Sequence, residues 1–265
     1  MTVLEFWGCA LITFGPALAM FSLTVAHDPI KVILLISSSF FWLLSFLSVA
    51  ICWSIISTFC DFLIIGALLA VIFQEIFRYL FHLATKKAQF YLAKILETNT
   101  SRPQTSSRRN EIQMNENAMT EFKDRIPLSY VSGLGFGLMN GAFSVMNVLT
   151  DYIGPGTVGL KGDSHYFLIV SSLTALAFIL LNVSWSILLS ESIEKTDKKL
   201  ATFVLVSHLI ATSITFVNRY HLQLISIVIV YTTTIICGLA AFQVAGLSPR
   251  RLMSSRDSRA PTNVN

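Results

Sequence analysis

Seven long apolar runs constrain the fold of this sequence more than any other feature. A helix needs about 20 residues to cross the roughly 30 Å hydrocarbon core of a bilayer, and each run approaches or exceeds that length. Because no water lies in that core to hydrogen-bond the backbone, each run is predicted to form a transmembrane helix. The runs extend over Val3–Val25, Val32–Trp53, Phe62–Leu83, Leu128–Leu149, Tyr166–Leu189, Leu200–Val217 and Leu222–Ala245. The predicted fold class is therefore all-α, a polytopic membrane protein with seven transmembrane helices.

The composition supports this fold class and excludes several functions. Hydrophobic residues make up 54% of the 265 residues and charged residues 13%, against about 25% charged in an ordinary soluble domain. So few charges neither cover the surface of a soluble enzyme nor form the basic patch of a nucleic-acid-binding protein. No phosphate-binding loop or cofactor motif is present. We therefore expect no cofactor, no nucleic acid and no small-molecule substrate, and we expect membrane lipid around the chain.

Lysine and arginine are distributed unevenly between the two membrane sides that seven helices define. Seventeen of the 19 basic residues fall on one side, and only Lys161 and Arg219 fall on the other. Basic residues accumulate on the cytosolic side of membrane proteins. The N-terminus is therefore predicted to be lumenal and the C-terminus cytosolic. On this topology the sequon at Asn99 lies in the cytosol and should carry no glycan.

The predicted organisation is one seven-helix transmembrane domain, residues 1–247, and a disordered cytosolic tail, residues 248–265. A cytosolic loop at about residues 86–126 includes the one extended polar stretch, rich in Ser, Asn, Arg and Glu, which we expect to be mobile. The second and third runs are joined almost without polar residues. Because this apolar region is too long for one crossing, a tight turn is required near Ser57–Asp61.

The fourth run has small residues at every fourth position: Ser129, Gly133, Gly137 and Gly141. Residues four apart share one face of a helix, so this pattern predicts a groove without side chains. A second helix can approach such a groove closely and gain dispersion and Cα–H···O contacts, which matter because lipid gives no hydrophobic drive for helix association. The pattern favours a packing and assembly face, whether the partner helix belongs to this chain or to another. Incidental glycines are the alternative.

Five polar residues interrupt the apolar runs: Gln74, Glu75 and Arg78 in the third, Asn182 in the fifth and His208 in the sixth. Ionisable groups at membrane depth are costly and usually have a role. Glu75 and Arg78 are three residues apart and can pair on one helix face. Alternatively, both lie at the cytosolic end of the helix and extend towards the headgroups. Asn182 and His208 are interpreted as hydrogen-bonded packing residues between helices rather than as ligands.

None of these residues forms a pattern typical of a catalytic centre. Gly141-Ala142-Phe143-Ser144 matches a serine protease motif poorly, and no pair of aspartates lies at mid-membrane depth. A zinc site needs at least three ligands. Glu75 and His208 offer two, and Asn182 is a poor third. The four cysteines form no CxxC pair. We predict no catalytic residue and no metal site.

Several short motifs, spread from about residue 3 to about residue 247, together carry a family resemblance. The fourth run has Val131–Gly137 followed by Asn140–Val145. The other matching motifs are Phe6-x-Gly8-Cys9, Phe14-Gly15-Pro16, Asp28-Pro29, Phe40–Leu43, Gln74-Glu75, Phe77-Arg78, Gly154-Pro155-Gly156, Val158-Gly159, Gly162-Asp163-Ser164 and Ser207-His208-Leu209. In these motifs the chain resembles the anterior-pharynx-defective (Aph) subunit family of the gamma-secretase complex.

The resemblance implies a function as well as seven spans with a lumenal N-terminus. Members of this family are non-catalytic scaffold subunits. They assemble with nicastrin and then receive presenilin and the presenilin enhancer, and presenilin supplies the catalytic aspartates. The complex cleaves type I membrane proteins such as Notch and amyloid precursor protein. The implied location is the endoplasmic reticulum, the Golgi and the plasma membrane.

By motif match, Gly133, Gly137 and Gly141 are the assembly glycines, and His208 matches the second of two family histidines. Asn182 stands where the family usually has the first histidine, which weakens an argument for shared proton or metal chemistry. The family is also distantly similar to intramembrane metalloproteases. The alternative function is therefore a stand-alone or degenerate metalloprotease-like protein. A seven-span receptor or transporter is a third class, disfavoured by the lack of a cysteine pair in the outer loops and of an inverted repeat.

Overall fold

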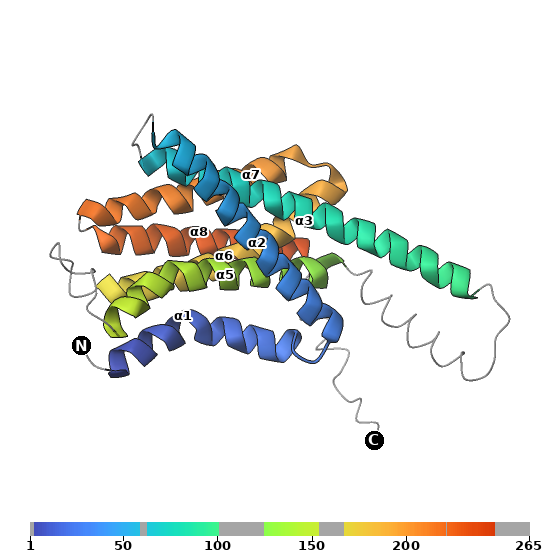
Figure 1. The fold of residues 1–265 in the computed structure, drawn as a ribbon, viewed down its shortest axis with the longest axis horizontal. Helices are drawn as coiled ribbons and strands as arrows, with labels where there is room; N and C mark the ends of the chain where they lie inside the picture. Colours follow the sequence, from blue (N-terminus) through green and yellow to red (C-terminus); the bar gives the residue numbers. More distant parts are fainter. Residues whose placement is uncertain (1–2, 59–62, 101–124, 154–166, 221, 247–265) are drawn as a thin grey trace, which may run out of the picture.

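The computed structural model describes residues 3–58, 63–100, 125–153, 167–220 and 222–246. Within these ranges the chain is helical and contains no strand. Figure 1 shows most of the helices packed side by side along the long axis of the molecule, with α2 and α3 running obliquely to the others. The elements are α1 (Val3–Thr24), α2 (Pro29–Ile56), α3 (Leu63–Thr100), α5 (Arg125–Ile153), α6 (Phe167–Lys195), α7 (Lys198–Ile214), the 3-10 helix η1 (Thr215–Tyr220) and α8 (Gln223–Val244).

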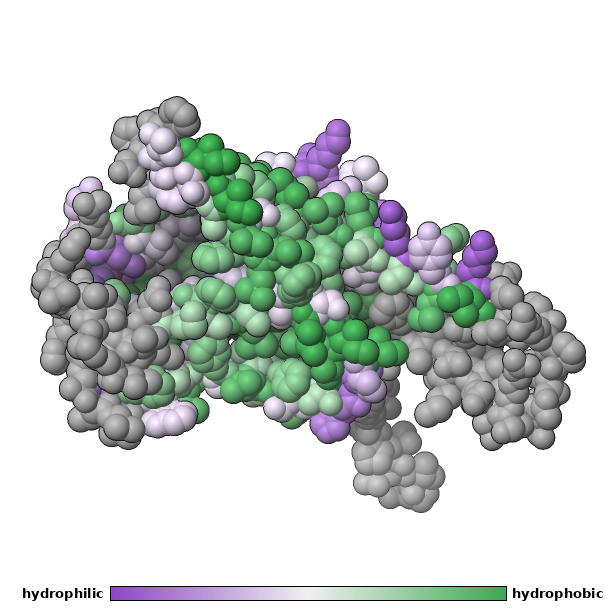
Figure 2. All heavy atoms as spheres, viewed as in Figure 1, coloured by the Kyte–Doolittle hydropathy of each residue, from purple (hydrophilic) through white to green (hydrophobic). Residues whose placement is uncertain are grey.

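The seven α-helices in the described ranges confirm the predicted all-α, polytopic fold class. Six of them are long and apolar enough to cross a membrane. The remaining helix, α5, is long enough but contains many glycine, serine and asparagine residues. It tolerates this lower hydropathy because it lies inside the bundle: Val131, Leu134 and Phe136 are each at most 1% exposed. Apolar side chains cover most of the viewed face, and hydrophilic ones gather towards the helix ends (Figure 2).

The helices alternate in direction, which defines two sides of the bundle. We call the side on which α1, α3, α6 and α8 begin the N-side, and the side on which α2, α5 and α7 begin the C-side. Two of the C-side turns are set by local chemistry. Asp28 caps α2 by accepting a hydrogen bond from the Ile30 amide at 2.9 Å, with Pro29 next to it at the start of the helix. Asp197 caps α7 in the same way through the Lys199 amide.

The connections differ from the predicted ones in one respect. The second and third helices are separate, as expected, because α2 ends at Ile56 and α3 begins at Leu63. However, α3 continues to Thr100, so the first part of the loop predicted at about residues 86–126 is helical. The apolar run ends at Leu83, where polar residues begin, but the Lys, Gln, Ala and Leu residues that follow are good helix formers. The rest of that loop, the turn residues 59–61, the motif residues 154–164 and the tail 248–265 lie outside the described residues.

Helices α5 and α6 form the centre of the bundle. In the most apolar 18-residue stretch of α6, 50% of the residues are buried, against 17–28% in the corresponding stretches of the other five candidate spans. One cluster of buried side chains joins α5 to α1, α2 and α3, with Trp42 and Phe136 among its members. A second cluster joins α6 to α7 and α8 and includes Trp185 and Leu188. The two clusters meet along α6, so this helix positions the residues of the candidate site.

Candidate functional site

The predicted groove on α5 is filled by α6 of the same chain. We call Gly133, Gly137 and Gly141 the glycine face. A Cβ atom added at Gly133 would lie 2.6 Å from the Val183 Cα and 2.8 Å from the Asn182 carbonyl oxygen. One added at Gly137 would lie 2.7 Å from the Ile179 carbonyl oxygen. These distances are shorter than real Cβ contacts, so only glycine allows the two backbones to approach this closely.

The opposite side of α5 makes a second close contact that the sequence pattern did not predict. A Cβ atom at Gly135 would meet the Ser38 hydroxyl and would lie 2.6 Å from the Leu35 carbonyl oxygen of α2. The Ser39 hydroxyl lies 3.2 Å from the Gly135 carbonyl oxygen and can donate to it. Helix α5 is therefore clamped between α2 and α6. The available signal was Gly135 itself, because a residue two positions from Gly133 lies on the far side of a helix.

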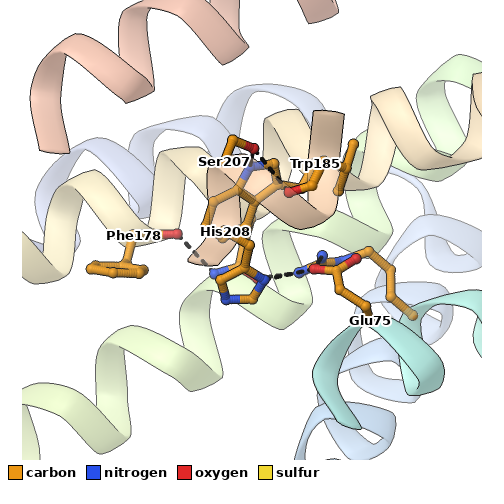
Figure 3. A network of polar contacts seen from close by, with 8 residues as sticks. Glu75, Phe178, Trp185, Ser207 and His208 are labelled. Atoms are coloured by element: carbon orange, nitrogen blue, oxygen red, sulfur yellow. Dashed lines mark hydrogen bonds and ion pairs between the residues drawn. The ribbon is translucent and has the colours of Figure 1, made fainter. Parts of the chain in front are cut away.

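Four of the predicted polar residues form one buried network between α3, α6 and α7 (Figure 3). Arg78 is 2% exposed, donates to the Glu75 carboxylate, and donates through Nη2 to the Asn182 Oδ1 at 2.5 Å. The Glu75 Oε1 also lies 2.7 Å from the His208 Nδ1. We call Glu75, Arg78, Asn182 and His208 the polar network. The predicted pairing of Glu75 with Arg78 is confirmed, and the alternative that Arg78 extends towards the headgroups is wrong.

Aromatic side chains enclose the network, and these were not predicted. Trp185 stacks on the His208 ring with centroids 4.0 Å apart, and its indole N–H donates to the Ser207 hydroxyl at 2.9 Å. The guanidinium carbon of Arg78 lies 5.3 Å from the centre of the Phe136 ring and 5.7 Å from that of Trp185. Such contacts stabilise a desolvated cation. A tryptophan in the middle of a span, away from the membrane interfaces where it is usually enriched, was a usable signal.

The two other predicted residues lie beside the network, one on each side. Gln74 lines a cavity of about 670 Å³, the N-side cavity, together with His208 and residues of α5, α6 and η1. Ser129 is buried and lines a small cavity of about 40 Å³, the C-side cavity, together with Arg78. Ser129 thus continues the predicted line of small residues on α5. Unlike the three glycines of that line, it lines this cavity.

The arrangement of the network favours internal pairing over metal binding. Among the described residues no group of three His, Cys, Asp or Glu side chains has a metal-binding arrangement. Glu75 and His208 do meet, yet the same carboxylate also pairs with Arg78. A guanidinium in contact with the carboxylate opposes a second cation there by direct repulsion. The geometry therefore makes Glu75 a counter-ion for a buried arginine.

Asn182 connects the network to α6, and its removal should destabilise the folded chain. Its Nδ2 donates to the Phe178 carbonyl oxygen at 2.8 Å, which leaves Oδ1 directed at Arg78. In Asn182→Ala the Arg78 Nη2 loses this acceptor, and we expect a loss of about 1–3 kcal/mol. Thermal unfolding in detergent, followed by size-exclusion chromatography, measures the effect. Ser184→Ala is the matched control, because among the described residues the Ser184 hydroxyl bonds only the Leu180 carbonyl of its own helix. Equal losses in both variants would contradict the prediction.

Comparison with known proteins gives a consistent result over almost the entire chain. A family model described as "Aph-1 protein" matches residues 4–248. "Gamma-secretase subunit Aph-1" of Drosophila melanogaster is 37% identical over 250 residues, covering 94% of this chain and 96% of the relative. "Gamma-secretase subunit Aph-1b" of Danio rerio is 38% identical over 261 residues, covering 95% and 93%. "Gamma-secretase subunit APH-1B" of Homo sapiens is 37% identical with the same coverage.

Proposed function

The chain belongs to the Aph-1 family, and from this membership we propose that it acts in the gamma-secretase complex as a non-catalytic scaffold subunit. A subunit role rests on its full-length similarity to relatives named as gamma-secretase subunits. The scaffold role is our further step. The single observation that carries it is that the glycine face and the polar network are both engaged within the chain.

This internal engagement makes the bundle a preformed frame. Helices α2, α5 and α6 are held at backbone-contact distance, and α3, α6 and α7 are held by hydrogen bonds to a buried cation. The outer surface is left apolar: Leu23, Leu224 and Val228 are among many large side chains that are more than half exposed. Such a surface suits contact with lipid and with the spans of other subunits.

We propose that these other subunits are presenilin, nicastrin and the presenilin enhancer. In this assembly presenilin performs the cleavage of type I membrane proteins such as Notch and amyloid precursor protein. This chain contributes no reacting group. The assembled complex passes through the endoplasmic reticulum and Golgi to the plasma membrane. The chemistry of the bundle supports this division of work, because the charged groups at its centre are paired with each other.

The alternative of a metalloprotease-like protein has no support. The relatives with full-length similarity are named as gamma-secretase subunits. In addition, the Glu75 Oε1 that faces His208 is already in contact with the Arg78 guanidinium, whose charge opposes a second cation there.

Assembly provides the direct test of the proposed function. We expect the tagged chain, extracted in mild detergent, to co-purify with presenilin, nicastrin and the presenilin enhancer. We also expect proteolysis by that preparation to disappear when the presenilin aspartates are replaced, since this chain supplies no catalytic group. The measurement is cleavage of a Notch-derived transmembrane peptide. Cleavage by the purified chain without presenilin would refute the non-catalytic role, and failure to recover the other subunits would refute the scaffold.

The topology gives an independent prediction. If the N-terminus is lumenal, a sequon placed in a short N-terminal tag receives a glycan, while the native sequon at Asn99 does not. The reason is the distribution of basic residues, seventeen of which fall on the opposite side. A mobility shift on glycosidase treatment reports both sites. A glycan on Asn99, or an unmodified tag, would reverse the orientation.

A further inference from the structure

Two cavities enter the bundle from opposite sides and end at the same place. The N-side cavity, about 670 Å³, extends from residues at the beginnings of α6 and α8, Phe167 and Gln223, to Gln74 and His208. The C-side cavity, about 40 Å³, extends from Lys86 and Glu194, on the C-side halves of α3 and α6, to Arg78. Gln74 and Arg78 are four residues apart on α3, which is about 6 Å along a helix. Little more than one helical turn separates the two cavities.

Both cavities contain buried polar atoms that no described protein group satisfies. In the N-side cavity these are the Gln74 Oε1, the Thr174 Oγ1 and the Asn218 Oδ1. In the C-side cavity they are the hydroxyls of Ser186 and Ser190. Buried polar groups without a protein partner take water where a cavity can hold it, and both volumes exceed the roughly 10–15 Å³ that one water requires. Each cavity therefore has both the room and the unsatisfied polar atoms to hold water, and we call the two cavities the vestibules.

The polar network forms the partition between the two vestibules. His208 lines the N-side cavity and contacts Glu75, Glu75 contacts Arg78, and Arg78 lines the C-side cavity. Phe136 and Trp185 lie against the guanidinium on its other sides. The arginine is held in place by Asn182 as well as by Glu75. The space between the two cavities is thus occupied by a guanidinium that Glu75 and Asn182 hold and that aromatic rings flank.

We propose that the polar network is a septum that keeps the bundle impermeable to protons and cations although water enters it from both sides. A fixed arginine at a constriction raises an electrostatic barrier to protons and other cations. The pairing with Glu75 holds the guanidinium in position, and the aromatic rings exclude a continuous file of water. This function is separate from the scaffold role and does not depend on it.

Proton flux into liposomes tests the septum. The full-length chain is reconstituted with a pH-sensitive dye inside, and a potassium gradient with valinomycin drives protons inward. In Glu75→Gln/Arg78→Gln both charges are removed while hydrogen-bonding groups remain, and we expect the flux to rise by about tenfold or more, which is about 1.4 kcal/mol of barrier. Asp28→Asn/Lys31→Gln removes a pair of the same spacing elsewhere, and should match the unmodified chain. An equal proton flux through both double variants would overturn the proposal.

Cysteine accessibility tests the vestibules in a chain whose network is intact. The native cysteines are first replaced, and single cysteines are introduced as Thr174→Cys in the N-side cavity or Ser190→Cys in the C-side cavity. Ag⁺ is added to one side of sealed vesicles. It should react with the thiol of Thr174→Cys only when added from the N-side, and with the thiol of Ser190→Cys only when added from the C-side. Reaction of either thiol with Ag⁺ from both sides, or from neither side, would overturn the proposal. This measurement keeps the septum falsifiable even if the neutralised double variant folds poorly.

Discussion

Replacing Gly137 by leucine is expected to separate α5 from α6 and to prevent recovery of the assembled complex. Even a single added Cβ atom would lie 2.7 Å from the Ile179 carbonyl oxygen, and a backbone atom cannot move aside as a side chain end can. Overpacking by a few methylene groups in a well-packed core costs about 1–3 kcal/mol, and more where the backbone must shift. The measurement is the yield of folded chain by size exclusion and the amounts of presenilin and nicastrin recovered with it.

A series of alanine variants separates this contact from a general effect of removing glycine. Gly133→Ala and Gly137→Ala should be strongly destabilising, because the added methyl group meets backbone atoms of Val183, Asn182 and Ile179. Gly141→Ala should be milder, because its methyl group meets side-chain atoms of Ile179 and Phe14 and no backbone atom among its three nearest contacts. Gly15→Ala is the control, because no atom from another described helix lies within 4 Å of a Cβ there. Equal behaviour of Gly133→Ala and Gly15→Ala would refute the close approach of α5 and α6.

Removing Glu75 alone is expected to be the second most damaging change. In Glu75→Ala the Arg78 guanidinium, 2% exposed, loses its counter-ion and remains buried as an unpaired charge. Breaking a buried ion pair on one side costs about 3–5 kcal/mol. The effect should appear as a large fall in the unfolding temperature in detergent and in the amount of chain reaching a folded peak.

The matching experiment removes both partners at once. Glu75→Gln/Arg78→Gln leaves no unpaired charge, and a buried pair replaced on both sides is often nearly neutral in stability. We therefore expect the double variant to recover most of the stability lost in Glu75→Ala. A double variant that is as unstable as the single one would show that Arg78 is stabilised mainly by Asn182 and by the aromatic rings.

The predictions that succeeded were those that depend on local properties. Helix α3 was expected because Phe62–Leu83 is apolar, and the pairing of Glu75 with Arg78 was expected from their spacing alone. The predicted end of α3 was wrong because it rested on hydropathy alone. Hydropathy falls after Leu83, but helix propensity does not, and the helix continues to Thr100. Hydropathy reports where lipid ends, which is a different boundary from the end of a helix.

The contacts between helices could not be predicted in this way. The pattern of Gly133, Gly137 and Gly141 indicated a face for close packing but not which helix fills it. The partner of Arg78 on α6, Asn182, is 104 residues distant in sequence, and the Glu75 partner His208 is 133 residues distant. Nothing in the spacing of these residues shows that they meet, and the tight packing of Gly135 against α2 was missed altogether.

The amino-acid sequence alone is enough to predict a bundle of membrane-spanning helices, because the cost of exposing backbone polar groups to lipid depends only on each segment's own residues. It also determined that one helix has a bare backbone face, because helical periodicity is a local property. That α6 covers this face, and that Arg78 is paired with Glu75 and Asn182 inside the bundle, can be seen only in the folded arrangement of the helices. Those outcomes depend on how all the helices pack at once, since each contact is made between segments that the chain brings together only when the whole bundle has formed.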